Sequence, residues 1–160
     1  MSKHPSIFER MKLQPNQLRT VADRRFDDAV VLVNTEQNAR ANGAMYLGGF
    51  VVECLLKAAL LEKYRWLQNA GSSTHQFGDN QRLWTLCYRL HDLEELLTRL
   101  PELKDRIAAS GTLGRTRLLP SLKAICVRWT IFARYSPRSA MIAEAEEFLA
   151  IIRELKPWLR

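Results

Sequence analysis

The sequence predicts an all-α protein, an antiparallel up-and-down bundle of four to five helices. Apolar residues recur at spacings of three and four along most of the chain, no strand-rich region competes, and no repeat with a period of about 20–50 residues is visible. The chain has 160 residues, of which 47% are apolar and 26% charged. This composition fits one soluble domain and excludes collagen, low-complexity disorder and a disulfide scaffold.

The first helix is expected over residues 17–36, after a flexible N-terminal arm of residues 1–14 that shows no helical period. Residues 15–160 then form one bundle domain. Asn16 is a good N-cap, and the apolar residues that follow it recur at helical spacing. These residues are Leu18, Ala22, Phe26, Ala29 and Val33.

The second helix is expected over residues 39–68 and is apolar around most of its circumference, which places it at the centre of the bundle. Small residues along it let a neighbouring backbone approach closely. Each glycine costs about 1 kcal/mol relative to alanine, so the packing at these positions should matter. The small residues are Ala41, Ala44, Gly48 and Gly49.

The middle of the chain is less regular. Residues 70–80 have the composition of a loop, and residues 82–90 fit a strand and a helix about equally, so they stay unassigned. A helix is expected over 92–99, because Asp92 followed by Glu95 resembles a capping box. Pro101 starts a further short turn.

Two helices are expected in the last third of the chain. Gly111 and Gly114 bracket a loop, a helix covers 116–132, and Ser136-Pro137 ends it. The last helix covers 138–156 and carries an apolar seam at spacings of 4, 3, 4 and 3. The seam residues are Met141, Ala145, Phe148, Ile152 and Leu155.

The positive charge is concentrated in one third of the chain. Residues 99–138 contain nine basic and two acidic residues and supply the whole net charge of +7. A polyanion such as nucleic acid is one interpretation, and a solvated helical surface is the other. The first requires the bases to share one continuous face, whereas the second predicts that they scatter.

Several other features point to a cytoplasmic protein without cofactors. Cys54, Cys87 and Cys126 are far apart in apolar surroundings and are read as buried small side chains. A zinc site around Cys87 and His91 lacks further ligands, so no metal is expected. The longest uncharged stretch in the apolar middle of the chain, residues 41–52, is too short for a membrane span, and residues 1–13 lack the apolar core of a secretory signal.

Polar residues inside apolar surroundings form the candidate ligand site. Glu53 and Lys57 are four apart in the most apolar segment, where they form either a helix-stabilising pair or part of a site. His91 lies at a helix start, and Arg134 and Tyr135 follow an apolar run. We expect these five residues to converge on one pocket at an end of the bundle, where an anion binds Arg134 and Lys57 and a base stacks on Tyr135.

Three segments in this order resemble prokaryotic HEPN domains: residues 42–58, the run beginning His91-Asp92-Leu93, and residues 129–137 with Arg134-Tyr135. The resemblance, to the type associated with minimal nucleotidyltransferases and toxin–antitoxin modules, implies a helical domain that dimerises and acts with a partner protein. Some such domains cleave RNA with an Arg and a His that follows after four to six residues. The small residues of 39–68, or the Met141 seam, are the expected homodimer surface.

This chain departs from the cleaving pattern. Arg134 stands six residues after Arg128, where the histidine is expected, and an arginine cannot shuttle protons at neutral pH. The sequence also lacks the common enzyme signatures. The expected function is therefore a non-catalytic module that binds nucleotide or RNA phosphate together with a partner such as a nucleotidyltransferase.

Two alternatives stay open. One is a metal-independent RNase toxin in which Arg128, Arg134, Tyr135 and His91 replace the usual pair. The other is a dimerisation or adaptor domain with no role in nucleic-acid binding.

Overall fold

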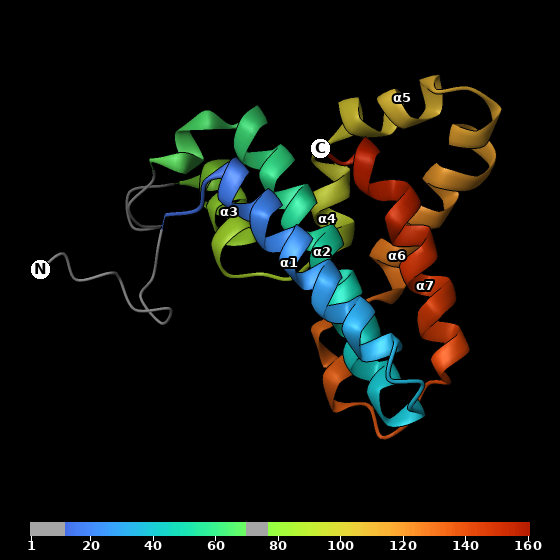
Figure 1. Cartoon of the computed structure of the whole chain (residues 1–160). Coiled ribbons are helices and arrows are strands. Elements are labelled where there is room, and N and C mark those ends of the chain that lie inside the picture. Colours follow the sequence, from blue (N-terminus) through green and yellow to red (C-terminus); the bar gives the residue numbers. More distant parts are fainter. Residues whose placement is uncertain (1–11, 70–76) are drawn as a thin grey trace, which may run out of the picture.

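The structure is a computed structural model that describes residues 12–69 and 77–160 (Figure 1). Within these residues it contains seven α-helices and no strand, which confirms the all-α bundle. The helices are more numerous and shorter than the four to five expected. Most of the expected arm 1–14 and most of the expected loop 70–80 lie outside the described residues.

Helix α2 (Asn38–Lys63) forms the centre of the bundle, as predicted. Its buried residues lie on every side of the helix rather than on one stripe, so other elements must cover it all round. Helix α1 (Pro15–Val33) makes the most extensive contact and runs alongside α2 (Figure 1). The predicted stripe of α1 is buried in full.

The ends of α1 differ from the prediction. The helix begins at Pro15, with Gln14 as the N-cap in place of Asn16. Proline suits the first helical position, because its φ is already helical and its missing N–H would have no partner there. The chain then leaves the helix after Val33, and Glu36 takes a left-handed conformation with φ 57°, which turns the backbone into α2.

The small residues of α2 make close contacts inside the protomer. A side-chain carbon added at Gly48 would lie 2.8 Å from Leu149 and 2.9 Å from Ile152 of helix α7 (Ile142–Leu155). At Gly49 it would lie 2.0 Å from the Trp129 indole nitrogen. Gly48 and Gly49, part of one of the two surfaces expected to form a dimer, therefore make these contacts within one chain.

Helix α2 is also shorter than expected. It ends at Lys63, and a separate 3-10 turn follows over Arg65–Gln68. Tyr88 donates a hydrogen bond of 2.8 Å from its hydroxyl to the Leu67 carbonyl, which holds this turn in place.

The unassigned stretch 82–90 is mostly helical. It belongs to α3 (Gly78–Tyr88), whose buried residues Leu83, Trp84, Leu86 and Cys87 recur with a helical period. Helix α4 (Leu93–Thr98) follows, and Asp92 caps it as predicted by accepting a 2.9 Å hydrogen bond from the Glu95 amide. The Glu95 side chain pairs with Arg82 instead of completing the capping box.

Helix α5 (Pro101–Ala109) extends the turn expected at Pro101 and lies across one end of the bundle (Figure 1). The loop expected at Gly111 and Gly114 is only partly correct. Gly111 turns the chain with φ 101°, whereas Gly114 opens a π-helical turn that continues into α6 (Leu119–Arg128). A side-chain carbon at Gly114 would lie 1.9 Å from the Ile107 carbonyl, so only glycine permits this approach to α5.

The prediction of a helix to residue 132 is wrong. Helix α6 ends at Arg128, Trp129 is extended, and a 3-10 turn follows over Ile131–Tyr135. The last helix starts at Ile142 rather than 138, because two α2 asparagines hold the preceding segment extended. Asn42 bonds the Arg138 carbonyl and the Ala140 amide, and Asn38 accepts from the Ile142 amide.

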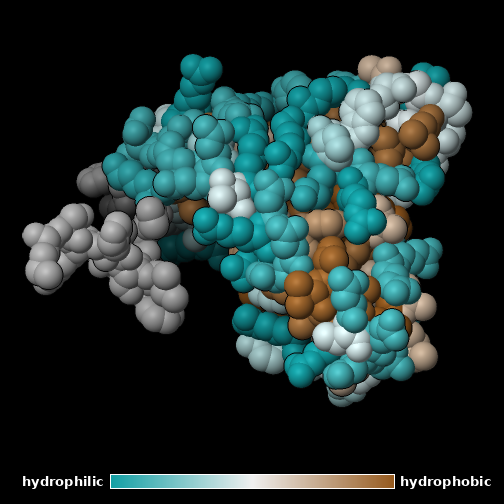
Figure 2. Space-filling view, in the orientation of Figure 1, coloured by the Kyte–Doolittle hydropathy of each residue, from teal (hydrophilic) through white to brown (hydrophobic). Residues whose placement is uncertain are grey.

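The buried seam of α7 also differs from the prediction. It consists of Ala145, Leu149, Ile152 and Leu155, whereas Met141 is 57% exposed and Phe148 is half-buried. Figure 2 shows hydrophilic side chains over the end of the molecule near α3, and apolar patches among hydrophilic side chains over its other half. Among the described helices, only α2 is long and apolar enough to span a membrane, and 72% of the window that meets this test is buried in the bundle.

Replacing Gly49 tests the contact that fixes Trp129 on α2. We expect Gly49→Ala to lower the free energy of unfolding by about 1–3 kcal/mol, because the rigid indole has to move away from the added methyl group. Urea denaturation followed by circular dichroism measures the change.

Gly43→Ala is the matched control. Its added carbon lies 3.3 Å from a terminal methyl of Leu32, which can rotate away, and alanine favours the helix by about 1 kcal/mol. A Gly49→Ala variant as stable as this control would contradict the packing argument.

Candidate functional site

Three of the five predicted site residues meet at the middle of α2. The Lys57 ammonium lies 2.7 Å from a Glu53 carboxylate oxygen, and His91 Nδ1 lies 2.9 and 3.0 Å from the two carboxylate oxygens. Glu53 is 2% exposed and Lys57 7% exposed. The structure thus contains a buried ion pair joined to a partly exposed histidine.

The local sequence explains this arrangement. Glu53 and Lys57 are one helical turn apart, with the acid on the N-terminal side, which favours a pair within the helix. Helix α3 ends at Tyr88, and Lys57 donates a 2.9 Å hydrogen bond to the Leu90 carbonyl just beyond it. The cluster therefore attaches the connection between α3 and α4 to the central helix.

The carboxylate also determines how His91 is protonated. A carboxylate only accepts hydrogen bonds, so Nδ1 carries the hydrogen and donates it to Glu53. In the neutral ring, Nε2 is then an acceptor. His91 lines a cavity of about 430 Å³ together with Arg89, Thr130 and Phe132. The cavity holds a positioned imidazole beside an exposed aromatic ring.

Arg134 and Tyr135 form a second group on the other side of Trp129. The Arg134 guanidinium lies 4.7 Å from the centre of the Tyr135 ring and 5.9 Å from that of Tyr46. Tyr46 in turn stacks on Trp129 at 5.9 Å. Neither Arg134 nor Tyr135 lines the cavity that contains His91, so the five residues occupy two places rather than one pocket.

The bases of the 99–138 segment do not form one uninterrupted cationic face. Arg99 pairs with Asp79, Arg117 with Glu154 and Arg138 with Glu144. Arg106 donates to backbone carbonyls near the end of the chain. Within the described residues the other five bases of the segment have no ion pair, and one of them, Arg134, lies in a short exposed stretch after α6 that contains no acidic residue.

The aromatic residues of this stretch are unusually exposed. Phe132 is 71% exposed and Tyr135 68% exposed. Phe132 lies within the helix expected over 116–132, and its exposure was not predicted because that helix ends at Arg128. The end of the helix at Trp129 turns this side chain outward.

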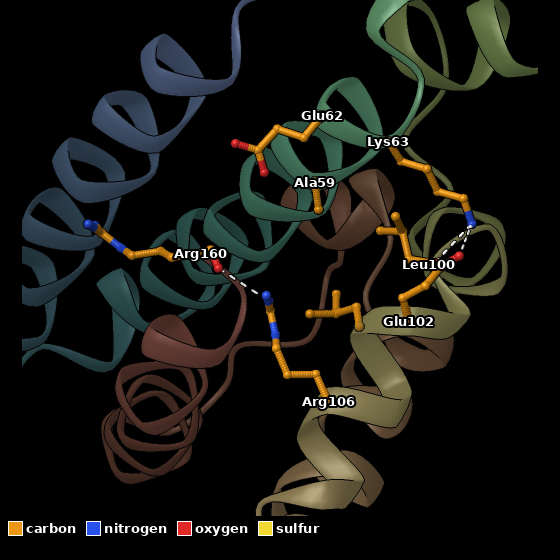
Figure 3. Close-up of a pocket in the computed structure, with 8 residues that line it drawn as sticks. Ala59, Glu62, Lys63, Leu100, Glu102, Arg106 and Arg160 are labelled. Carbon is orange, nitrogen blue, oxygen red and sulfur yellow. Dashed lines mark hydrogen bonds and ion pairs between the residues drawn. The ribbon is translucent and has the colours of Figure 1, made fainter.

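A second cavity, of about 450 Å³, lies between the end of α2 and α5 (Figure 3). Its charged groups are engaged with one another. Lys63 pairs with Glu102 at 2.8 Å, and Arg106 donates to the Arg160 carbonyl (Figure 3). Because these charged groups are already paired, the cavity is a weaker candidate for a ligand-binding site than the stretch after α6.

The cysteines are buried, as predicted, and burial raises the pKa of each thiol to about 12. Such thiols are poor nucleophiles and poor metal ligands at neutral pH. The described part of the chain also contains no group of three His, Cys, Asp or Glu side chains placed to hold a metal ion.

No family model, no curated protein and no solved structure matches this chain. Its class therefore follows from the fold and the site. It is an all-α bundle with a buried Glu–Lys–His cluster and an exposed aromatic and basic turn.

Removing one partner tests the buried cluster. Lys57→Met leaves Glu53 charged in an apolar helix with only His91 beside it, and we expect a loss of about 3–5 kcal/mol in the free energy of unfolding. The double variant Glu53→Met with Lys57→Met should lose less than the sum of the two single variants, because neither buried charge remains. Urea denaturation of all four proteins measures the coupling, and strict additivity would contradict a direct ion pair.

Proposed function

We propose that this protein is a non-catalytic, HEPN-like helical module of the cytoplasm that binds RNA or nucleotide phosphate. The observation that carries the proposal is the stretch after α6, which contains two exposed aromatic residues and an exposed arginine that lies over one of the two rings. Phe132 and Tyr135 offer flat faces for bases, and Arg134 offers a cation for phosphate.

The surroundings of this stretch support the same class of ligand. The sequence has no acidic residue between Asp105 and Glu144, and Glu144 is itself paired with Arg138. The stretch around Arg134 therefore adds no negative charge of its own, whereas Asp92 and Glu94 line the cavity on the side of Phe132. Stacking and cationic contacts of this kind bind single strands with little sequence preference.

The resemblance to HEPN domains supports a partner protein, such as a small nucleotidyltransferase, within a toxin–antitoxin or defence system. A dimerisation or adaptor role without nucleic acid is the alternative, and the partial scatter of the bases favours it. RNA binding distinguishes the two.

Binding of a labelled single-stranded RNA oligonucleotide, followed by fluorescence anisotropy, tests the proposal. We expect Phe132→Ala with Tyr135→Ala to weaken binding by about tenfold or more, because each lost stack is worth about 1–3 kcal/mol. Arg134→Ala should weaken binding and lower the slope of log affinity against log salt by about one. ATP as competitor shows whether a single nucleotide suffices.

Arg24→Ala is the matched control, since Arg24 is exposed on α1 and its loss changes the net charge equally. If Arg24→Ala weakens binding as much as Arg134→Ala, the binding is a general effect of charge. Absence of RNA and ATP binding in the wild type would favour the adaptor role.

A metal-independent RNase is the second candidate, and the held tautomer of His91 favours it. One observation argues against an RNase: Arg134 does not line the His91 cavity. The residue that would transfer the proton is therefore separate from the residue expected to bind the phosphate. We expect no cleavage of single-stranded RNA in the presence of a chelator. Cleavage that His91→Ala abolishes would establish the RNase.

A further inference from the structure

The cavity that contains His91 has a charge pattern that suits an uncharged base better than a phosphate. Its volume is about 430 Å³, and the ionised side chains that line it are those of Asp92, Glu94 and Arg89. Two carboxylates and one guanidinium give the lining an excess of negative charge, which repels a phosphate group. Phe132, which is 71% exposed, lines the same cavity and offers a flat ring on which a base stacks.

His91 presents a hydrogen-bond acceptor to this cavity. The two nitrogens of an imidazole point to nearly opposite sides of the ring. Nδ1 donates to Glu53, whose side chain is buried on α2, so Nε2 is directed away from the core. Within residues 12–69 and 77–160, Nε2 has no hydrogen-bond partner. In the neutral ring this nitrogen accepts one hydrogen bond, and an N–H group of a ligand is the complement that satisfies it.

The cavity also contains hydrogen-bond donors. The Thr130 hydroxyl oxygen accepts a 3.2 Å hydrogen bond from the Phe132 amide, so the hydroxyl hydrogen is still available for a ligand. Arg89 carries further N–H groups, and its guanidinium lies 5.2 Å from the centre of the Trp84 ring. The complementary ligand is therefore a flat ring whose edge carries both a donor and an acceptor.

We propose that this cavity selects adenine or cytosine over uracil, with His91 Nε2 as the acceptor that distinguishes them. The Watson–Crick edge of adenine and cytosine has an exocyclic amine next to an unprotonated ring nitrogen. The amine donates to His91 Nε2, and the ring nitrogen accepts from Thr130 or Arg89. Uracil has a carbonyl oxygen in place of the amine, which sets one acceptor against another and leaves both unpaired.

This inference rests on the proposed function, because it assigns a base preference to the RNA that the stretch after α6 binds. Phe132 connects the two, since it lines the cavity and lies two residues before Arg134 in the same 3-10 turn. The division of roles follows from charge. The arginine side of the turn binds phosphate, and the acidic side with His91 binds the edge of a base.

Binding of labelled oligocytidine and oligouridine of equal length, followed by fluorescence anisotropy at about pH 8, tests the preference. At this pH an ordinary histidine is neutral. Cytosine and uracil have the same ring size, so the ratio of their affinities reports the edge of the base rather than stacking. We expect the wild type to bind oligocytidine about fivefold or more tighter, the discrimination typical of a well-placed pair of hydrogen bonds.

His91→Asn tests the residue. The asparagine amide keeps an N–H near the position of Nδ1 for Glu53 and removes Nε2, so the ratio should fall to about one. Circular dichroism checks the fold of this variant. If it does not fold, Glu94→Gln replaces it, since Glu94 is exposed and its side chain has no ion pair among the described residues. Loss of this carboxylate should lower the ratio by about twofold.

Arg134→Ala is the control for phosphate binding, and it should weaken the binding of both oligonucleotides by the same factor. Equal affinity for the two, or tighter binding of oligouridine, would overturn the base preference and leave the proposed function standing. A ratio that a folded His91→Asn retains would overturn the role of His91. A wild type that binds neither oligonucleotide would overturn the proposed function together with this inference.

Discussion

The rest of the structure depends on the need to cover α2 on all sides. A helix with buried residues around its whole circumference is stable only if other elements exclude water from each face. Helix α1 covers one face, α7 packs over Gly48, and Trp129 lies over Gly49. One and two turns further along the face of Gly49, buried charges make the contact, through Glu53, Lys57 and the Leu90 carbonyl.

Trp129 explains why the polar residues form two groups. Its indole lies directly against the α2 backbone at Gly49, between Tyr46 and Glu53 on the same helix. His91 reaches Glu53 on one side of the indole, and Arg134 lies over Tyr46 on the other. The packing that completes the core thereby separates the buried Glu53–Lys57 pair from Arg134 and Tyr135.

The charged residues of the surface also divide into those that pair within the protomer and those that stay exposed without an ion pair among the described residues. Several bases of the 99–138 segment pair with acids that lie far away in the sequence, such as Glu154 and Asp79, and these pairs fix helix ends rather than attract a ligand. Exposed pairs of this kind contribute little stability individually. The exposed turn after α6, with Phe132, Arg134 and Tyr135, is a part of the surface that this internal pairing leaves for other molecules.

The sequence by itself determined the all-α class, the central place of α2, the buried stripe of α1, the Asp92 cap, the buried cysteines and the close spacing of Glu53 and Lys57. Each of these depends on local period, capping or composition. Tertiary structure alone decided where α6 and α7 begin and end, that Phe132 is exposed, and that Arg134 is kept apart from His91. The physical reason is that these features depend on contacts between distant residues, such as Asn42 with the Arg138 carbonyl and Gly49 with Trp129, and no local pattern encodes them.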